Sequence, residues 1–248
     1  MALLHSFESS GNFLFRNRGQ IPVFLFILAI PIIYITNISY LTPTWEFIIQ
    51  MLAVSISFAG FLIRAITIGT TPAGTSGRNT KEGQVANELN TTGIYSVIRH
   101  PLYLGNFLMW IGIVFFTYNL YFVIIVSLGY WLYYERIMFA EERFLEKKFG
   151  ESYLDWSLQA PAFIPSFGNY KKSDIPFSVK SVLRREYSGV LATVFGFVFI
   201  DNLRQFFTFN TFSISRASNI ALIFSLIIVL IIRTLKHHTS LLNESGRS

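Results

Sequence analysis

Long apolar runs alternate with short polar turns along most of the chain. Four runs have the roughly 20 residues that a membrane-spanning helix needs. They are Ile21–Leu41, Trp45–Ile68, Tyr187–Phe207 and Phe212–Arg233. Residues 101–139 form a longer apolar block, which a polar break at Thr117-Tyr118-Asn119 divides into two helices. The pattern predicts an all-α integral membrane protein with about six transmembrane helices, including a tight helical hairpin over 101–139. A polar helical segment follows at 140–186, and we expect it to be cytoplasmic.

Basic residues decide the expected orientation of these helices. They gather in the N-terminal segment, the loop 69–100, the segment 140–186 and the C-terminal tail, whereas the turns at 42–44 and 117–120 carry none. Because loops rich in Lys and Arg stay in the cytoplasm, we expect a multi-pass protein with both termini cytoplasmic. The chain then divides into two N-terminal transmembrane helices (1–68), a core with a polar loop and the hairpin (69–165), and a basic linker with two C-terminal helices (166–248).

The composition favours a membrane protein and argues against several kinds of site. Hydrophobic residues make up 52% of the 248 residues and charged residues 14%, whereas a soluble domain carries about 25% charged residues. The net charge of +6 reflects the basic cytoplasmic loops, where anionic lipid head groups balance it. These basic residues are spread over separate loops, so we expect no nucleic-acid binding. With no Cys and four His, we expect no thiolate nucleophile and no metal site.

Three charged residues fall inside the predicted transmembrane helices. Arg64 lies about one turn from the cytoplasmic end of its helix, and we expect its side chain to reach the lipid head groups. Asp201 and Arg204 are three residues apart on one helix, a spacing at which we expect them to pair with each other. Both features are therefore interpreted as structural.

The most polar and turn-rich stretch, residues 91–107, leads into an apolar helix. His100 precedes Pro101, which favours an extended backbone at His100 and the first helical position for the proline. The free N–H groups and the positive dipole end of that helix face the preceding loop, which predicts an anion site. The loop carries Gly93, suited to a left-handed turn, Tyr95 and Arg99. In the alternative interpretation, the stretch is a basic interfacial anchor with an aromatic belt.

Two carboxylates, Glu141 and Glu142, lie where the hairpin ends and have no cation three or four residues away. The charges that follow do have such partners, as Arg143 has in Glu146. Because the two ends of a hairpin lie side by side, we expect both carboxylates to face the loop that carries His100. A ligand with an anion next to hydroxyl or amino groups fits between them. Which carboxylate faces the ligand is left open.

The motifs of this core follow one another in a fixed order. They are Gly93-Ile94-Tyr95, Arg99-His100-Pro101-Leu102-Tyr103-Leu104-Gly105, Glu141-Glu142, Phe149-Gly150-Glu151-Ser152-Tyr153 and Ile164-Pro165. In order and spacing they resemble the membrane methyltransferase superfamily of isoprenylcysteine carboxyl methyltransferases and phospholipid N-methyltransferases. The resemblance implies S-adenosylmethionine as the cofactor and no metal. It implies a cofactor pocket lined by Gly93, Tyr95, His100, Pro101, Tyr103, Gly105, Glu141 and Glu142. It also implies catalytic roles for Arg99, His100 and Glu142.

Four cations near this core are expected to bind the substrate: Arg78, Lys81, Arg136 and Arg143. The loop 75–96 and the six-helix layout resemble a bacterial subgroup assigned to methylate the 1-phosphate of Kdo2-lipid A. This resemblance implies a membrane lipid as substrate, in the bilayer of the bacterial inner (cytoplasmic) membrane. A prenylated cysteine carboxylate and the amine of phosphatidylethanolamine are alternative acceptors. A non-catalytic transporter or lipid-binding scaffold is the alternative from another class, and a sterol-type reductase is a further one.

Overall fold

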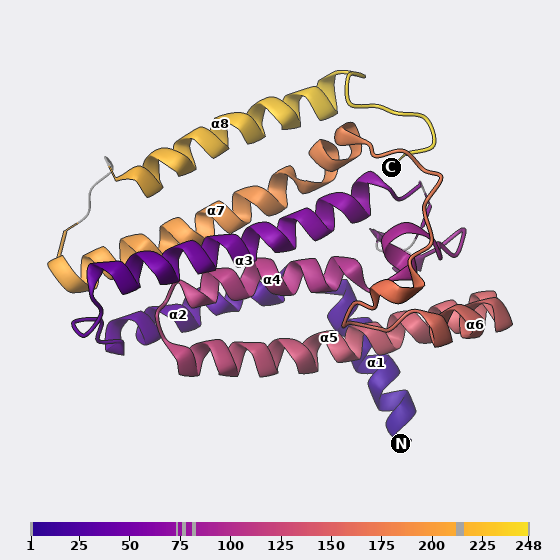
Figure 1. Ribbon diagram of the computed structural model, residues 1–248, viewed down its shortest axis with the longest axis horizontal. Helices are drawn as coiled ribbons and strands as arrows, with labels where there is room; N and C mark the ends of the chain where they lie inside the picture. The colour runs from indigo at the N-terminus through magenta and orange to yellow at the C-terminus, as the bar shows by residue number, and fades with distance from the viewer. Residues whose placement is uncertain (1, 73, 76–77, 81–82, 212–215, 248) are drawn as a thin grey trace.

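The computed structural model describes residues 2–72, 74–75, 78–80, 83–211 and 216–247 (Figure 1). Within these ranges the chain forms eight α-helices and one antiparallel ribbon of two strands. The helices are α1 (Leu3–Arg16), α2 (Phe24–Ile35), α3 (Pro43–Gly69), α4 (Pro101–Phe115), α5 (Leu120–Phe149), α6 (Glu151–Gln159), α7 (Val179–Phe209) and α8 (Ala217–His238). The strands are β1 (Arg78–Thr80) and β2 (Gly83–Val85). The predicted helical class is therefore correct apart from this short ribbon.

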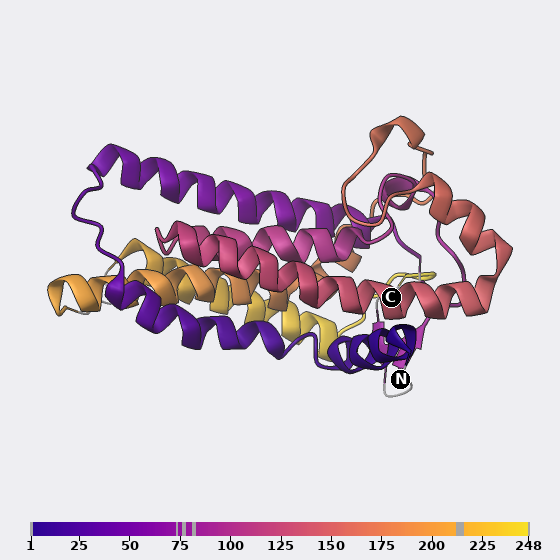
Figure 2. The same ribbon diagram turned by 90° about the horizontal axis from the view of Figure 1, so that it is seen from below.

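The apolar helices lie side by side in an elongated bundle (Figures 1 and 2). They are α2, α3, α4, α5, α7 and α8. One end of the bundle carries α1, α6, both chain termini and the loops that precede α4 and follow α6 (Figures 1 and 2). We call this the site end. The α4–α5 turn and the C-terminal end of α7 lie at the opposite end, which we call the far end.

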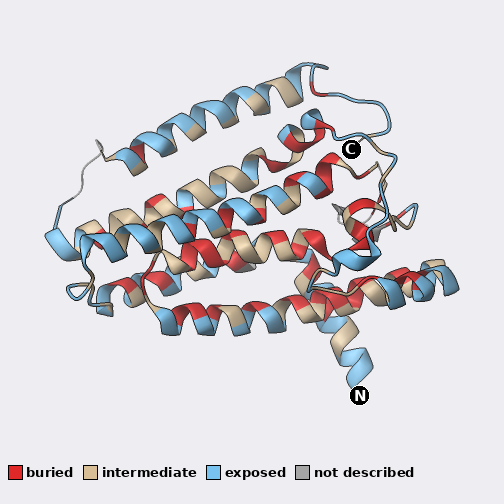
Figure 3. Ribbon diagram, viewed as in Figure 1, coloured by how far each residue is buried: buried red, intermediate tan, exposed pale blue. Residues whose placement is uncertain are grey.

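Four of these helices, α3, α5, α7 and α8, are long and apolar enough to cross a membrane. The other two apolar helices are shorter, with 12 residues in α2 and 15 in α4. Much of α8 is exposed (Figure 3). Its exposed residues include large apolar ones such as Ile223, Phe224 and Leu230. Such a surface suits a hydrocarbon solvent, in which each helix satisfies its own backbone. The chain is thus a helical membrane protein, and four of the predicted helices have the full spanning length.

The first predicted transmembrane helix, Ile21–Leu41, is shorter in the structure. A 3-10 turn covers Ile21–Val23, and α2 ends at Ile35. The hydroxyl of Thr36 donates to the carbonyl of Ile32 at 2.5 Å, and the backbone N–H of Ser39 donates to the Asn37 side chain at 2.8 Å. Side chains that bond to nearby backbone in this way compete with continued helix.

The predicted hairpin is present, with its turn where the sequence places it. α4 ends at Phe115 and α5 begins at Leu120. The Asn119 side chain accepts a hydrogen bond from the backbone N–H of Phe122 at 2.9 Å and so caps α5. Tyr118 has a φ of 59°, which reverses the chain. α5 runs on past the predicted end at 139 to Phe149, so the Glu141-Glu142 pair lies on the same rigid helix as the second arm of the hairpin.

Small residues let α3 and α4 approach each other closely. A Cβ atom on Gly60 of α3 would lie 2.6 Å from the carbonyl oxygen of Gly105 on α4. A Cβ atom on Gly105 would lie 2.5 Å from Cγ of Arg64. Such contacts between small residues are a common way for transmembrane helices to pack. The contact fixes Arg64 against the first turns of α4.

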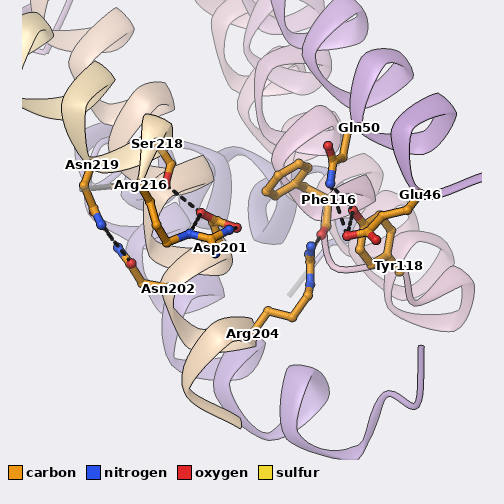
Figure 4. Close-up of polar contacts among 10 residues, drawn as sticks. All are labelled: Glu46, Gln50, Phe116, Tyr118, Asp201, Asn202, Arg204, Arg216, Ser218 and Asn219. Atoms are coloured by element: carbon orange, nitrogen blue, oxygen red, sulfur yellow. Dashed lines mark hydrogen bonds and ion pairs between the residues drawn. The ribbon is translucent and has the colours of Figure 1, made fainter. Parts of the chain in front are cut away.

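The predicted pairing of Asp201 with Arg204 is wrong, as Figure 4 shows for the far end of the bundle. Asp201 pairs with Arg216 at 2.9 Å and accepts a hydrogen bond from Ser218 at 2.6 Å. Arg204 instead donates to the carbonyl of Phe116, and its guanidinium lies 3.9 Å from the centre of the Tyr118 ring. Arg216 donates to both carboxylate oxygens of Asp201, at 3.1 and 2.9 Å, and such bidentate pairs are among the stronger charge-assisted contacts.

The expectation that Arg64 reaches the lipid head groups is also wrong. Its side chain is only 18% exposed and makes an ion pair with Glu186 of α7 at 2.6 Å. Glu186 is 122 residues away in sequence, so no local spacing indicates the contact. Arg64 is therefore bound inside the bundle, where a charge needs a partner to offset its desolvation.

Candidate functional site

A cavity of about 240 Å³ lies at the site end, where α3, α4, α5 and α7 meet the loop before α4. Six of the predicted site residues line it: Tyr95, Arg99, His100, Pro101, Tyr103 and Glu141. The cavity is also lined by Arg18, Arg64, Asn106 and Arg185, none of which the sequence indicated as a site residue. The cavity is thus lined by the Arg-His-Pro motif and Glu141 of the core, and also by residues before and after the core, such as Arg18 and Arg185.

Hydrogen bonds to later segments hold the loop before α4 in place. Gly93 has a φ of +61°, the left-handed turn that the sequence predicts. The backbone N–H of Arg99 donates to the carbonyl of Pro161 at 2.8 Å, and that of His100 to Ala162 at 3.2 Å. His100 has a φ of −120° and Pro101 is the first residue of α4, both as predicted. The loop therefore presents His100 at the N-terminus of α4.

Both carboxylates of the hairpin face this loop, as predicted. Nε2 of His100 lies 2.9 Å from Oε1 of Glu142, and its Nδ1 lies 3.6 Å from Oε2 of Glu141. Nε of Arg99 donates to Glu142 at 2.9 Å, and the Tyr103 hydroxyl donates to Glu141 at 2.7 Å. Glu141 lines the cavity. Glu142 does not, but it pairs with His100 and Arg99, which do.

The charge state of His100 follows from these neighbours. Burial lowers the pKa of His100, but its contacts with Glu141 and Glu142 raise the pKa by more, so that it lies above the ordinary 6.5. Burial also raises the pKa of Tyr95 to about 12. The two carboxylates therefore favour the protonated, positively charged form of the His100 side chain, and the Tyr95 phenol is neutral at neutral pH. In that form Nε2 donates to Glu142 at 2.9 Å, and Nδ1 lies 3.6 Å from Glu141.

This charge state makes a prediction about pH. We expect the imidazole of His100 to titrate with a midpoint above 6.5 when ¹⁵N shifts of the purified protein are followed by NMR. Since the pKa is raised on folding, the stabilisation by His100 is complete below pH 6.5 and disappears as the pH rises through the folded pKa. His100→Gln identifies the resonance by its loss. A midpoint below 6.5 would contradict the paired imidazolium.

The other predicted site residues lie outside the lining of the cavity. A Cβ atom on Gly93 would lie 3.1 Å from Ser173, and Gly105 faces Arg64. The guanidinium of Arg136 lies 3.2 Å from the centre of the Phe7 ring. Arg143 pairs with Glu146 at 2.6 Å, as the sequence predicts. For the remaining cations, only the backbone of Arg78 in β1 is described, and Lys81 lies outside the described residues.

The residues that line the cavity can be compared with the groups of S-adenosylmethionine, the cofactor that the resemblance implies. The cofactor carries a carboxylate, an amino group, ribose hydroxyls and a flat adenine ring. Cations and the N-terminus of α4 suit its carboxylate, Glu141 suits the amino group or ribose, and Tyr95 and Tyr103 supply aromatic faces. Within the described part of the chain, no group of three or more His, Asp or Glu side chains is placed to hold a metal ion.

Comparison with known proteins points to a family of membrane methyltransferases. Residues 46–152 match the phospholipid methyltransferase family. The segment contains α4, α5, His100 and both carboxylates of the hairpin. It does not contain Arg18, Arg185 or Glu186. The match, together with two isoprenylcysteine methyltransferase relatives, supports the predicted superfamily of membrane methyltransferases.

The relatives cover different shares of the chain. The nickel-cobalt-cadmium resistance protein NccN of Alcaligenes xylosoxydans xylosoxydans is 28% identical over 63% of this chain and 70% of its own length. The cobalt-zinc-cadmium resistance protein CzcN of Cupriavidus metallidurans is 35% identical over 36% of this chain and 41% of its own. The protein-S-isoprenylcysteine O-methyltransferase of Schizosaccharomyces pombe is 34% identical over 31% and 33%. No solved structure matches the chain.

Proposed function

We propose that the protein is an S-adenosylmethionine-dependent integral membrane methyltransferase that acts on a lipid head group. The observation that carries the proposal is the cluster of His100, Glu141 and Glu142 at the cavity. All three residues lie inside the segment that matches the family. The cavity lies at the end of an apolar bundle, the level at which a lipid of the bilayer presents its head group.

Each residue of the cluster has a distinct role in this proposal. Glu141 accepts hydrogen bonds from the amino group or ribose of the cofactor. The positive charges of Arg99 and His100 attract the cofactor's carboxylate to the N-terminus of α4. Glu142 and Arg99 hold the imidazolium in place. The bound cofactor supplies an activated methyl group on a sulfonium. The chain itself then has to align the acceptor with that methyl group and exclude water, which needs no nucleophilic side chain.

For the acceptor we propose an anionic oxygen. The lining of the cavity contains Arg18, Arg64, Arg99, Arg185 and His100 against the carboxylate of Glu141. The specific candidate is the 1-phosphate of Kdo2-lipid A, in a bacterial inner membrane with both termini and the site end in the cytoplasm. A prenylated cysteine carboxylate, the class in the names of two relatives, is the second candidate. The proposed contacts of Arg78, Lys81, Arg136 and Arg143 are with the more distant parts of the lipid head group.

Cofactor binding tests the proposal directly. We expect the purified protein to bind S-adenosylmethionine in calorimetry. His100→Ala is expected to weaken the affinity about tenfold or more, since a positive charge near the cofactor's carboxylate is lost and Glu141 and Glu142 lose a partner. His237→Ala, a change at an exposed histidine near the end of α8, is the matched control and keeps wild-type affinity. A folded wild-type protein that binds no cofactor would overturn the proposal and favour a transporter or a lipid-binding scaffold.

A further inference from the structure

The ion pair between Arg64 and Glu186 joins three helices at the wall of the cavity. Nε and Nη2 of Arg64 donate to the two carboxylate oxygens of Glu186, at 2.6 and 2.7 Å. Nη1 of Arg64 donates to the side chain of Asn106 at 2.7 Å. Arg64 belongs to α3, Asn106 to α4 and Glu186 to α7. The guanidinium is therefore fixed in position and orientation by two neighbours.

This fixed guanidinium is part of the cavity rather than of the apolar interior. Arg64 and Asn106 both line the cavity, and so does Arg185, the residue before Glu186 on α7. A guanidinium has five N–H groups in a planar fork, and the pair with Glu186 and the bond to Asn106 use three of them. Nη1 also donates to the carbonyl of Leu102 at 3.5 Å, so one N–H group of Nη2 remains outside these contacts. A phosphate or carboxylate is the group that such a fork recognises.

The balance of charge favours an anion at this wall. Five positive groups line the cavity, together with one carboxylate, that of Glu141. Among the described residues, Glu186 pairs with Arg64, and Glu142 pairs with Arg99 and His100. The cofactor's single carboxylate is matched by His100 and the N-terminus of α4 in the proposed function. Arg64 and Arg185 lie on different helices from that cluster, α3 and α7. They are thus placed for a second anion.

Glu186 also lines a second, apolar hollow of about 200 Å³ between α7 and α8. Its other walls include Val190 and Ile228, and it lies on the helices that exceed the matched segment 46–152. The ion pair therefore has the polar cavity on the side of Arg64 and a hydrocarbon-like groove on the side of Glu186. An acyl chain would bury apolar surface in this groove next to the ion pair, whereas free phosphate has no chain to bury there.

We propose that Arg64 and Arg185 form the subsite for the anion of the acceptor lipid, and that Glu186 is the positioning residue that holds Arg64 in it. The inference rests on the proposed function and assigns the substrate class, an anionic lipid. The proposal also gives α7 a role in function. This helix supplies Arg185 and Glu186, which lie outside the segment 46–152 that matches the family. The acceptor site is then incomplete without α7.

Binding of a soluble short-chain lipid tests the subsite separately from the cofactor. We expect dioctanoyl phosphatidic acid to bind the full-length protein in calorimetry at least about tenfold more tightly than dioctanoyl phosphatidylcholine, which has no net charge, or inorganic phosphate, which has no chain. Glu186→Gln is expected to weaken phosphatidic acid binding about tenfold, and Glu186→Asp to restore most of it. Affinity for S-adenosylmethionine stays within about twofold in both variants, which a general loss of structure would not allow.

Arg185→Gln provides a second variant, because it removes a cation from the cavity wall without breaking the buried pair. It is expected to weaken phosphatidic acid binding several-fold and to leave cofactor binding unchanged. The matched control is Asp201→Asn, which breaks an ion pair on the same helix, about 22 Å from Glu186. It is expected to leave the affinities for phosphatidic acid and for the cofactor unchanged. Equal affinities of wild type, Glu186→Gln and Arg185→Gln for phosphatidic acid would overturn the subsite. A wild type that binds phosphatidic acid but no cofactor would instead overturn only the proposed function.

Discussion

Glu186→Ala is expected to lower the free energy of unfolding by about 3–5 kcal/mol, the usual cost of removing one partner of a buried ion pair. Arg64 then keeps its charge in a site where its side chain is 18% exposed, with Asn106 as its remaining side-chain partner. Unfolding in mixed micelles with increasing sodium dodecyl sulfate measures the change. The control is Asp201→Ala, since its partner Arg216 is 34% exposed and such partly solvated pairs contribute about 1 kcal/mol or less.

The double variant Arg64→Met with Glu186→Met separates stability from function. Replacing a buried ion pair by apolar side chains of similar volume is often neutral or stabilising, so we expect it to unfold within about 1 kcal/mol of the wild type. Binding of dioctanoyl phosphatidic acid should nevertheless be lost. If Glu186→Ala has the same free energy of unfolding as the wild type, the ion pair is well solvated, and Glu186 does not hold the guanidinium of Arg64 in a fixed position. If the double variant keeps its lipid affinity, Arg64 is no part of the subsite.

The sequence was most informative where the structure is local. Asn119 caps α5 and Pro101 starts α4, because both residue types act on the backbone within one turn. The hairpin itself then brings Glu141 and Glu142 to His100, since its two arms must return to the same end. The His100 cluster was therefore predictable from turn residues, the hairpin and two carboxylates without local partners.

Contacts between distant segments were not predictable in this way. Arg64 pairs with a carboxylate 122 residues away, and Arg216 reaches Asp201 from beyond the end of α7. Charge spacing along one helix says nothing about partners on another, so Asp201 and Arg204 were paired wrongly. The signal for the Arg64 pair was present in Glu186, a carboxylate at the start of an apolar run. The sequence alone could not identify Glu186 as the partner of Arg64, because it does not show that α3 and α7 lie side by side.

Glu141→Gln is expected to weaken S-adenosylmethionine binding and to slow methyl transfer, each by about 100-fold. The amide can still accept the hydrogen bond of the Tyr103 hydroxyl, which donates to Glu141 at 2.7 Å, so the fold around the cavity is kept. What is lost is the negative charge on the cavity wall, and removing one partner of a desolvated, charge-assisted contact costs about 2–5 kcal/mol. Calorimetry with the cofactor and transfer of a labelled methyl group into total lipid extract measure the two effects.

Glu142→Gln and Glu135→Gln show whether this loss belongs to Glu141 in particular. Glu135 lies on the same helix and does not line the cavity, so its variant should behave like the wild type. Glu142 acts through His100, so its loss should move the titration of His100 down toward the ordinary pKa of 6.5 and weaken cofactor binding less than Glu141→Gln does. If Glu142→Gln weakens binding more, then Glu142 holds the cofactor and Glu141 is the positioning residue. If neither change matters, the cofactor does not bind in this cavity, because no carboxylate of the hairpin then contacts it.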